Sequence, residues 1–199
     1  MHQNLTFFST CLSPLRNIKH HPSTNPERNL RILKVLENKS PCNFLVFGLG
    51  HDSLMWTALN HGGRTVFLEE DKSWIQQIQR QIPSLESYHV VYDTKVTQAD
   101  ELLEISTKEE CKAVGDPRFS KCPLALKGLP NEVYDIEWDL IMVDAPTGYF
   151  DGAPGRMSAI YTAGLMARNR EMVRLMCSCM MLIEWWRTNS QRHCCVKVT

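Results

Sequence analysis

Two glycines and a group of acids have the types and the spacing that a nucleoside-binding site requires. The apolar run 44–47 breaks at a Gly-Leu-Gly turn, residues 48–50, and a second apolar run, 65–68, ends on the three acids of 69–71. Glycines let the backbone approach a ligand closely, and a carboxylate about 20 residues further on accepts hydrogen bonds from ribose hydroxyls. The pattern therefore predicts the cofactor-binding residues Gly48 and Gly50, with Glu69 or Glu70 on the ribose.

The glycine turn also indicates which cofactor would fit. The third glycine of the dinucleotide fingerprint is absent, because Ser53 stands in its place. That glycine serves the close packing of a helix at a pyrophosphate, so its absence favours a cofactor without phosphates, such as S-adenosylmethionine. The alternative is a purely structural turn between a buried strand and a helix, with acids that only solvate the end of a strand.

These residues need a sheet to bring them together, and the hydrophobic pattern predicts one. Apolar or alternating runs are separated by stretches of helical composition and by Gly/Pro loops. The expected strands are 44–47, 65–68, 88–93 and 139–144. The expected helices are 29–38, 53–60, 72–81, 98–105 and 156–168. Strands that alternate with helices predict an α/β fold with a mostly parallel sheet, whose ligands bind at the carboxyl ends of the strands.

Length, charge and hydropathy narrow the class of protein. A chain of 199 residues suffices for one domain with its own core, and residues 1–27, polar and aperiodic, are expected to form a disordered lead-in. The formal net charge is zero, so electrostatics gives no reason to expect binding to nucleic acid or to an anionic membrane surface. The sequence contains no apolar run of about 18 residues, so it predicts no transmembrane anchor.

One pair of cysteines has the placement of a loop-closing disulfide. Cys111 and Cys122 lie on either side of the turn-forming residues 115–117, inside a loop expected over 106–131. In an oxidising compartment they could form a disulfide bond. The alternative is two unpaired loop thiols.

Five sequence blocks carry a resemblance to a known family. They are NFLVFGLGHDSLMW (43–56), FLEED (67–71), YDTKV (92–96), DLIMVDAPTGY (139–149) and APGRM (153–157). In this order they resemble the plant glucuronoxylan 4-O-methyltransferases, which belong to the polysaccharide-biosynthesis domain family that also holds the xylan proteins named for irregular xylem. The resemblance runs from about residue 29 to residue 170, and the glycine and acid blocks look like the methyltransferase branch.

The resemblance implies both a fold and a function. It implies a Rossmann-like class I methyltransferase fold that moves a methyl group from S-adenosylmethionine to O4 of glucuronic acid side chains on xylan. The implied setting is the Golgi apparatus during secondary wall synthesis, with the polysaccharide as substrate and other Golgi xylan-synthesis proteins as candidate partners. The alternative function is a catalytically inactive family member that acts as a binding or scaffold component.

The resemblance also suggests roles for residues beyond the glycine turn. Asp93, after the third expected strand, could meet the adenine amino group. Asp144 faces the methyl donor and could act as a general base, or could ligate a divalent metal that holds the acceptor; the alternative is an acid that caps the next loop. Arg156 could pair with the glucuronate carboxylate, since a guanidinium suits it, although an exposed arginine at a helix start is the commoner case.

The segment 171–199 departs from the family. It is rich in Met, Cys and Trp and lacks a strand–turn–helix pattern. In a reading frame that starts two nucleotides later, permitted codons allow it to be read with a VFVHDVDR strand similar to the family's continuation. We therefore predict a methyltransferase-like domain over 28–170, altered after residue 170 by a frameshift or a mis-spliced end. A genuine cysteine-rich tail is the alternative.

An altered end has consequences for the sheet. If 171–199 supplies no further strand, strand 139–144 is left as an open edge with exposed backbone groups and apolar surface. The sequence therefore predicts a poorly stable chain. It also predicts an inactive one, because the lost strand would carry groups beside the methyl donor.

Overall fold

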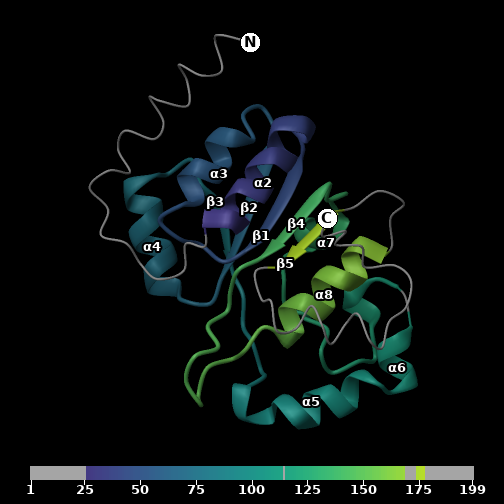
Figure 1. Cartoon of the computed structure of the whole chain (residues 1–199). Helices are drawn as coiled ribbons and strands as arrows, with labels where there is room; N and C mark the ends of the chain where they lie inside the picture. The colour runs from purple at the N-terminus through teal and green to yellow at the C-terminus, as the bar shows by residue number, and fades with distance from the viewer. Residues whose placement is uncertain (1–25, 114, 169–173, 178–199) are drawn as a thin grey trace.

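The computed structural model describes residues 26–113, 115–168 and 174–177 of the chain, and within them the strands form one parallel sheet (Figure 1). Five strands lie in the order β3-β2-β1-β4-β5, and every neighbouring pair is parallel. The strands are β1 (Asn43–Phe47), β2 (Arg64–Glu69), β3 (Glu86–His89), β4 (Leu140–Val143) and β5 (Arg174–Cys177). The predicted α/β class with a parallel sheet is confirmed.

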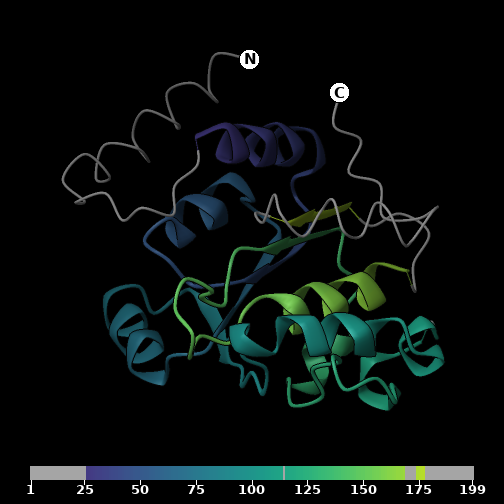
Figure 2. The same cartoon turned by 60° about the horizontal axis from the view of Figure 1, so that its bottom comes forward.

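The helices form a layer on each face of this sheet (Figure 2). One layer holds α2 (Pro26–Lys39), α3 (Ser53–Leu59) and α4 (Lys72–Gln81). The other holds α5 (Ala99–Ser106), α6 (Glu109–Lys112), α7 (Asn131–Asp135) and α8 (Met157–Arg168), with the 3-10 turns η2 (Val96–Gln98) and η3 (Pro117–Phe119). None of the described helices has the length and apolarity to span a bilayer.

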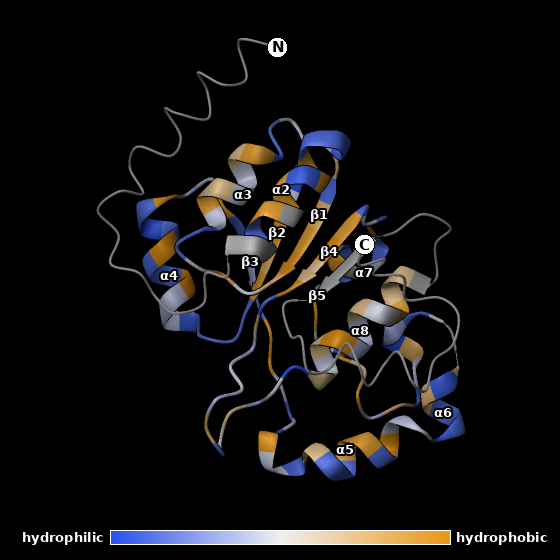
Figure 3. Cartoon of the chain, in the orientation of Figure 1, coloured by the Kyte–Doolittle hydropathy of each residue, from blue (hydrophilic) through white to orange (hydrophobic). Residues whose placement is uncertain are grey.

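The central strand β1 has an uninterrupted apolar sequence because both of its faces are covered. Phe44 and Val46 pack into the core beneath α2, α3 and α4, whereas Leu45 and Phe47 pack into the core beneath α7 and α8. Side chains alternate between the two faces of a strand, so a strand buried on both sides needs an apolar residue at each position. In Figure 3 strands β1 and β4 are accordingly coloured as hydrophobic, with hydrophilic residues on the outer sides of α4, α5 and α6.

Helix α4 occupies the predicted residues 72–81, and its first turn is held by a local contact. The Asp71 carboxylate accepts hydrogen bonds from the backbone N–H groups of Ser73 and Trp74. A side chain that satisfies the first N–H groups of a helix marks its start, and Pro83 disfavours its continuation. The cap also lowers the pKa of Asp71, chiefly through the Ser73 hydroxyl.

Two expectations for the middle of the chain are wrong. The third strand is β3, so it ends four residues before Asp93. Its pairing with β2 stops where β2 itself ends, at Glu69 opposite His89, and Val91 is exposed in the loop that follows. The loop expected over 106–131 also contains α6 and η3 and reaches the start of α7.

The sheet does not end at β4. Strand β5 pairs with β4 over its whole length, with Leu140 opposite Arg174 and Val143 opposite Cys177, so the expected open edge on β4 is wrong. Helix α2 begins at Pro26, two residues inside the expected lead-in. Residues 1–25 and 178–199 lie outside the described residues, so the disordered lead-in and the shifted reading frame stay predictions.

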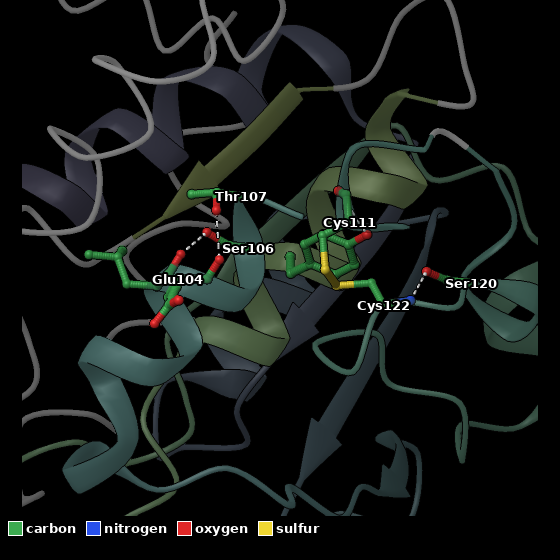
Figure 4. Close-up of a disulfide and its surroundings, with 8 residues drawn as sticks. Glu104, Ser106, Thr107, Cys111, Ser120 and Cys122 are labelled. Atoms are coloured by element: carbon green, nitrogen blue, oxygen red, sulfur yellow. Dashed lines mark hydrogen bonds between the residues drawn. A yellow bond between two sulfur atoms is a disulfide. The ribbon is translucent and has the colours of Figure 1, made fainter. Parts of the chain in front are cut away.

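The segment between α5 and α7 adds an outer layer to α8, and a disulfide holds it (Figure 4). Cys111 on α6 is bonded to Cys122, which confirms the disulfide and excludes the alternative of two unpaired thiols. Both sulfur-bearing residues are buried together with Leu165 of α8. The Tyr161 hydroxyl, also on α8, donates to the Cys111 carbonyl at 3.1 Å. The bond therefore fixes the layer at the point where it contacts the domain.

The Cys111→Ser/Cys122→Ser variant is expected to lose about 2–3 kcal/mol of unfolding free energy. The bond joins residues 11 apart, and a crosslink of that length restricts the unfolded chain by roughly this amount. Urea denaturation, followed by circular dichroism, measures the loss. Dithiothreitol should lower the midpoint of the unmodified protein toward that of the variant and leave the variant unchanged. An unmodified protein whose midpoint ignores the reductant would contradict the prediction.

Candidate cofactor site

Gly48 forms the turn that ends β1, and its backbone shape requires glycine. Its φ is 126°, a conformation that side-chain-bearing residues rarely adopt. A Cβ at this position would lie 3.1 Å from the Ala145 Cβ, so the glycine also lets β1 pass close to the end of β4. The Gly48 N–H donates to the Leu68 carbonyl at 2.7 Å, which ties the turn to β2. The ends of three strands therefore meet at this residue.

Gly50 has a different role in the same turn. Its φ is not in the left-handed region, and the nearest obstacle to a Cβ is the movable Asp52 carboxylate, at 2.8 Å. Its N–H donates to the Ser53 hydroxyl at 2.9 Å, so the residue that replaces the third glycine of the dinucleotide pattern closes the turn. Gly50 is half-buried and leaves its backbone accessible. Of the two glycines, only Gly48 has a backbone conformation that requires glycine.

Glu69 joins the end of β2 to the glycine turn. One carboxylate oxygen accepts from the Leu49 N–H at 3.1 Å, and the other accepts from the Asp71 N–H at 3.0 Å. On its other side the Leu49 peptide accepts from the Trp74 indole N–H at 2.6 Å. Burial raises the pKa of Glu69, opposed by the Asp71 and Leu49 hydrogen bonds. A carboxylate held by two backbone donors is prepositioned beside the turn and retains lone pairs for further donors.

Glu70 faces the loop that follows β4. Its Oε1 lies 3.4 Å from both the backbone N and the hydroxyl of Thr147. The two glutamates that the sequence left as alternatives are therefore distinct. Glu69 contacts the glycine turn, and Glu70 spans from β2 to the loop after β4.

Tyr92 is a member of this group that the sequence prediction missed. Its ring packs against the core beneath α8, and its buried hydroxyl has no hydrogen-bond partner. Burial, followed by the charges of Glu70 and Glu69, raises the pKa of Tyr92, while Arg156 opposes the rise. The residue is thus a neutral phenol among charged groups, and an unpaired buried hydroxyl is costly unless a ligand supplies its partner. Membership of the family-like block 92–96 was the only sequence signal for it.

Asp144 lies where β4 ends, beside the glycine turn. It is half-buried, and a Cβ on Gly48 would lie 3.8 Å from its own Cβ. Its N–H donates to the Phe47 carbonyl at 3.0 Å. The structure therefore brings Asp144 next to the turn, as the sequence predicted, while its catalytic role stays a prediction.

Arg156 lies at the other end of the same loop. Its Nε donates to the Pro146 carbonyl at 3.0 Å, and its positive charge is felt at Tyr92. The substrate-binding role of Arg156 stays a prediction. Asp93 is exposed in the loop after β3, so its expected contact with adenine also stays a prediction.

The metal-ligand role expected of Asp144 stays a prediction. Among residues 26–113, 115–168 and 174–177, no three His, Cys, Asp or Glu side chains gather closely enough to hold an ion. Divalent cations of the magnesium type take several oxygen ligands. We therefore derive no step of a reaction through a metal.

A separate cavity of about 280 Å³ lies near the amino-terminal end of β4, away from the glycine turn. Ile136 and Trp138, which precede β4 in the chain, form part of its wall. The charged side chains in its wall form ion pairs with one another: the Arg118 guanidinium lies 2.7 Å from the Asp116 carboxylate and 2.6 Å from the Asp135 carboxylate. This cavity is therefore separate from the group around the glycine turn.

The fold and the site define the class of protein. A parallel sheet in the order β3-β2-β1-β4-β5, with a glycine turn after β1 and an acid at the end of β2, is a Rossmann-like cofactor-binding domain of the methyltransferase type. The sequence model of the IRX15/IRX15L/GXM family matches residues 29–181, and the chain belongs to this family. The match includes all five strands.

Curated relatives refine this assignment. Glucuronoxylan 4-O-methyltransferase 1 of Arabidopsis thaliana is 66% identical over 158 residues, covering 76% of this chain and 56% of the relative. Arabinogalactan O-methyltransferase 2 of the same plant is 50% identical over 167 residues, covering 79% and 57%. Protein IRREGULAR XYLEM 15 is 45% identical over 134 residues, covering 66% and 42%. The chain spans about half the length of the curated relatives it matches. No solved structure matches it.

Proposed function

We propose that this chain is the cofactor-binding part of a methyltransferase that acts on O4 of glucuronic acid side chains of xylan, with S-adenosylmethionine as methyl donor. The observation that carries the proposal is the 66–70% identity to three glucuronoxylan 4-O-methyltransferases. The identity to Arabinogalactan O-methyltransferase 2 is lower, at 50%, which favours xylan over arabinogalactan as the acceptor.

The residues around the glycine turn suit such a cofactor. In the proposed arrangement the half-buried Glu69 carboxylate accepts hydrogen bonds from the ribose hydroxyls, because it is fixed directly beside the turn. Gly50 leaves the backbone open to the ligand. The Tyr92 hydroxyl, buried without a partner in the protein, donates to the bound ligand. Asp93, in the loop after β3, would contact the adenine.

The chain's own residues also suffice for a chemical proposal. When bound, S-adenosylmethionine supplies an electrophilic methyl group on a sulfonium. Asp144 accepts the proton that the O4 hydroxyl loses as the new O–CH₃ bond forms and the S–CH₃ bond breaks. Arg156 pairs with the glucuronate carboxylate and so orients the sugar. Both residues border the same loop.

The disulfide supports the proposed compartment. Bonds of this kind persist in oxidising compartments, and the secretory pathway is one of them. We propose that the protein works in the Golgi apparatus beside other xylan-synthesis proteins.

Sequencing the transcript across the Arg170 codon would test the proposal that the segment after it is read in a shifted frame.

Because β5 occupies the edge of β4, we expect activity instead of the inactivity predicted from the sequence. The full chain is expected to bind S-adenosylmethionine in calorimetry and to transfer a labelled methyl group to glucuronoxylan in preference to arabinogalactan. The assay is run with and without excess EDTA, and metal assistance predicts that activity falls with EDTA and returns with added metal. Product analysis should locate the methyl group on O4 of glucuronic acid. Cofactor binding without transfer to either acceptor would favour the inactive binding component instead. A chain that binds no cofactor would contradict the proposal.

A further inference from the structure

The loop between β4 and α8 is closed at its base and fixed to a neighbouring segment. The Gly155 N–H donates to the Thr147 carbonyl at 3.0 Å, which brings the two ends of the loop together. The Val96 N–H donates to the Ala153 carbonyl at 2.8 Å, and the Thr94 hydroxyl donates to the Pro154 carbonyl at 3.0 Å. The loop, drawn in green, stands away from the helices in Figure 1. It is thus an ordered projection.

Two aromatic side chains are exposed on this fixed loop. Tyr149 is 83% exposed and Phe150 is 52% exposed. Their rings pack edge to face, with centroids 5.4 Å apart and an angle of 68° between the planes. The Ala153 N–H donates to the Phe150 carbonyl at 2.9 Å, and Gly152 leaves room for the ring, since a Cβ there would lie 3.4 Å from Phe150 Cε2. The backbone therefore presents both rings to the solvent.

The loop connects the rings to the proposed transfer site. It begins directly after Asp144 and ends at Arg156, whose Nε donates to the Pro146 carbonyl. At Thr147 it also approaches the Glu70 carboxylate, at 3.4 Å. A ligand that engages the acids at the end of the sheet can therefore extend along this loop toward the rings.

We propose that Tyr149 and Phe150 form a platform for the uncharged pyranose chain of the acceptor polysaccharide. A pyranose ring has a face of C–H groups that packs on an aromatic ring, while its hydroxyls remain in water at the edge. Two rings next to Asp151 and two glycines form too small an apolar surface for a stable protein interface, which buries about 1,200–2,000 Å². The inference rests on the proposed function, because a polysaccharide acceptor extends beyond the sugar that is methylated.

The test compares the full chain with its Tyr149→Ala/Phe150→Ala variant. Xylohexaose without glucuronate and glucuronoxylan are the two saccharide probes, measured by calorimetry and by affinity electrophoresis. The variant is expected to bind both about tenfold more weakly, which corresponds to about 1.4 kcal/mol. Its affinity for S-adenosylmethionine should be unchanged. Phe119→Ala is the matched control, since Phe119 is 81% exposed but lies on η3, outside this loop.

The outcomes separate this inference from the proposed function. Equal affinity of the variant and the unmodified protein for both saccharides, or no saccharide binding by either, overturns the platform even if methyl transfer is observed. Weaker saccharide binding by the variant supports the platform even if the protein transfers no methyl group. Unchanged saccharide binding together with loss of a dimer in sedimentation would assign the rings to a contact between copies of the chain and overturn the inference.

Discussion

The Gly63→Ala variant is expected to lose about 3 kcal/mol or more of unfolding free energy. A Cβ on Gly63 would lie 2.5 Å from the Asn60 Oδ1 and from the Cys42 carbonyl oxygen, and 2.6 Å from the Cys42 nitrogen. Asn60 is buried, and its amide accepts from the Cys42 N–H at 3.0 Å and donates to the Cys42 carbonyl at 2.8 Å. Overpacking costs about 1–3 kcal/mol, and each buried polar group left unpaired costs about as much.

Urea denaturation of the two purified proteins measures this loss. Gly164→Ala is the matched control, because a Cβ there meets nothing within 4 Å and the residue lies inside α8. Alanine is the better helix former, so this control should gain up to about 1 kcal/mol. A Gly63→Ala protein with the same urea midpoint as the unmodified chain would contradict the prediction, because it would show that the turn between α3 and β2 can relax.

The Glu69→Ala variant is expected to bind S-adenosylmethionine about 100-fold more weakly. The substitution removes the proposed acceptor of the ribose hydroxyls, and it also leaves the Leu49 N–H without its carboxylate partner. Hydrogen bonds to a charged group contribute about 1.5–3 kcal/mol, and about 2.7 kcal/mol is a factor of 100 in affinity. The expected effect is therefore larger than that of losing one neutral hydrogen bond.

Calorimetry with the full chain tests the prediction, and denaturation of the same samples shows whether the fold is retained. Glu69→Gln keeps the length of the side chain but carries a single acceptor oxygen. Its affinity for S-adenosylmethionine should therefore lie between those of the unmodified protein and the Glu69→Ala variant. Glu101→Ala, an exposed acid on α5, is the control and should bind as the unmodified protein does. A folded Glu69→Ala protein whose affinity stays within about threefold would exclude Glu69 as the ribose partner.

The parts of the fold that the sequence predicts well have local or uniform causes. β1 and β4 are apolar at nearly every position because each is buried on both faces, and α4 is bounded by the Asp71 cap and by Pro83. The sequence prediction places the third strand at 88–93 instead of at β3, because the extent of an edge strand is determined by the strand with which it pairs. Its residues are only half-buried, and the end of β2 at Glu69 determines where pairing stops. Composition alone does not show that limit.

The candidate site was predicted in the same uneven way. Gly48, Glu69 and Asp144 follow apolar strands, and parallel strands bring their carboxyl ends to one edge. The different contacts of Glu69 and Glu70 depend on which neighbouring loop each carboxylate reaches, and the sequence left this open. Tyr92 lies in a loop that the sequence pattern assigned to a strand, so its buried and unpaired hydroxyl emerges only from packing.

The position of β1 in the sheet determines the order in which its two neighbouring strands can pair with it during synthesis. Its partner on one side, β2, follows within about 20 residues, but Phe44 pairs on the other side with Leu140, 96 positions later (140 − 44 = 96). A nascent chain made from its N-terminus can assemble β1, β2 and β3 early, while β1 still has a row of unsatisfied N–H and C=O groups along its other side. Contacts between distant residues form slowly. During that interval the nascent chain is most exposed to aggregation and to capture by chaperones, at the strand that later becomes the most protected.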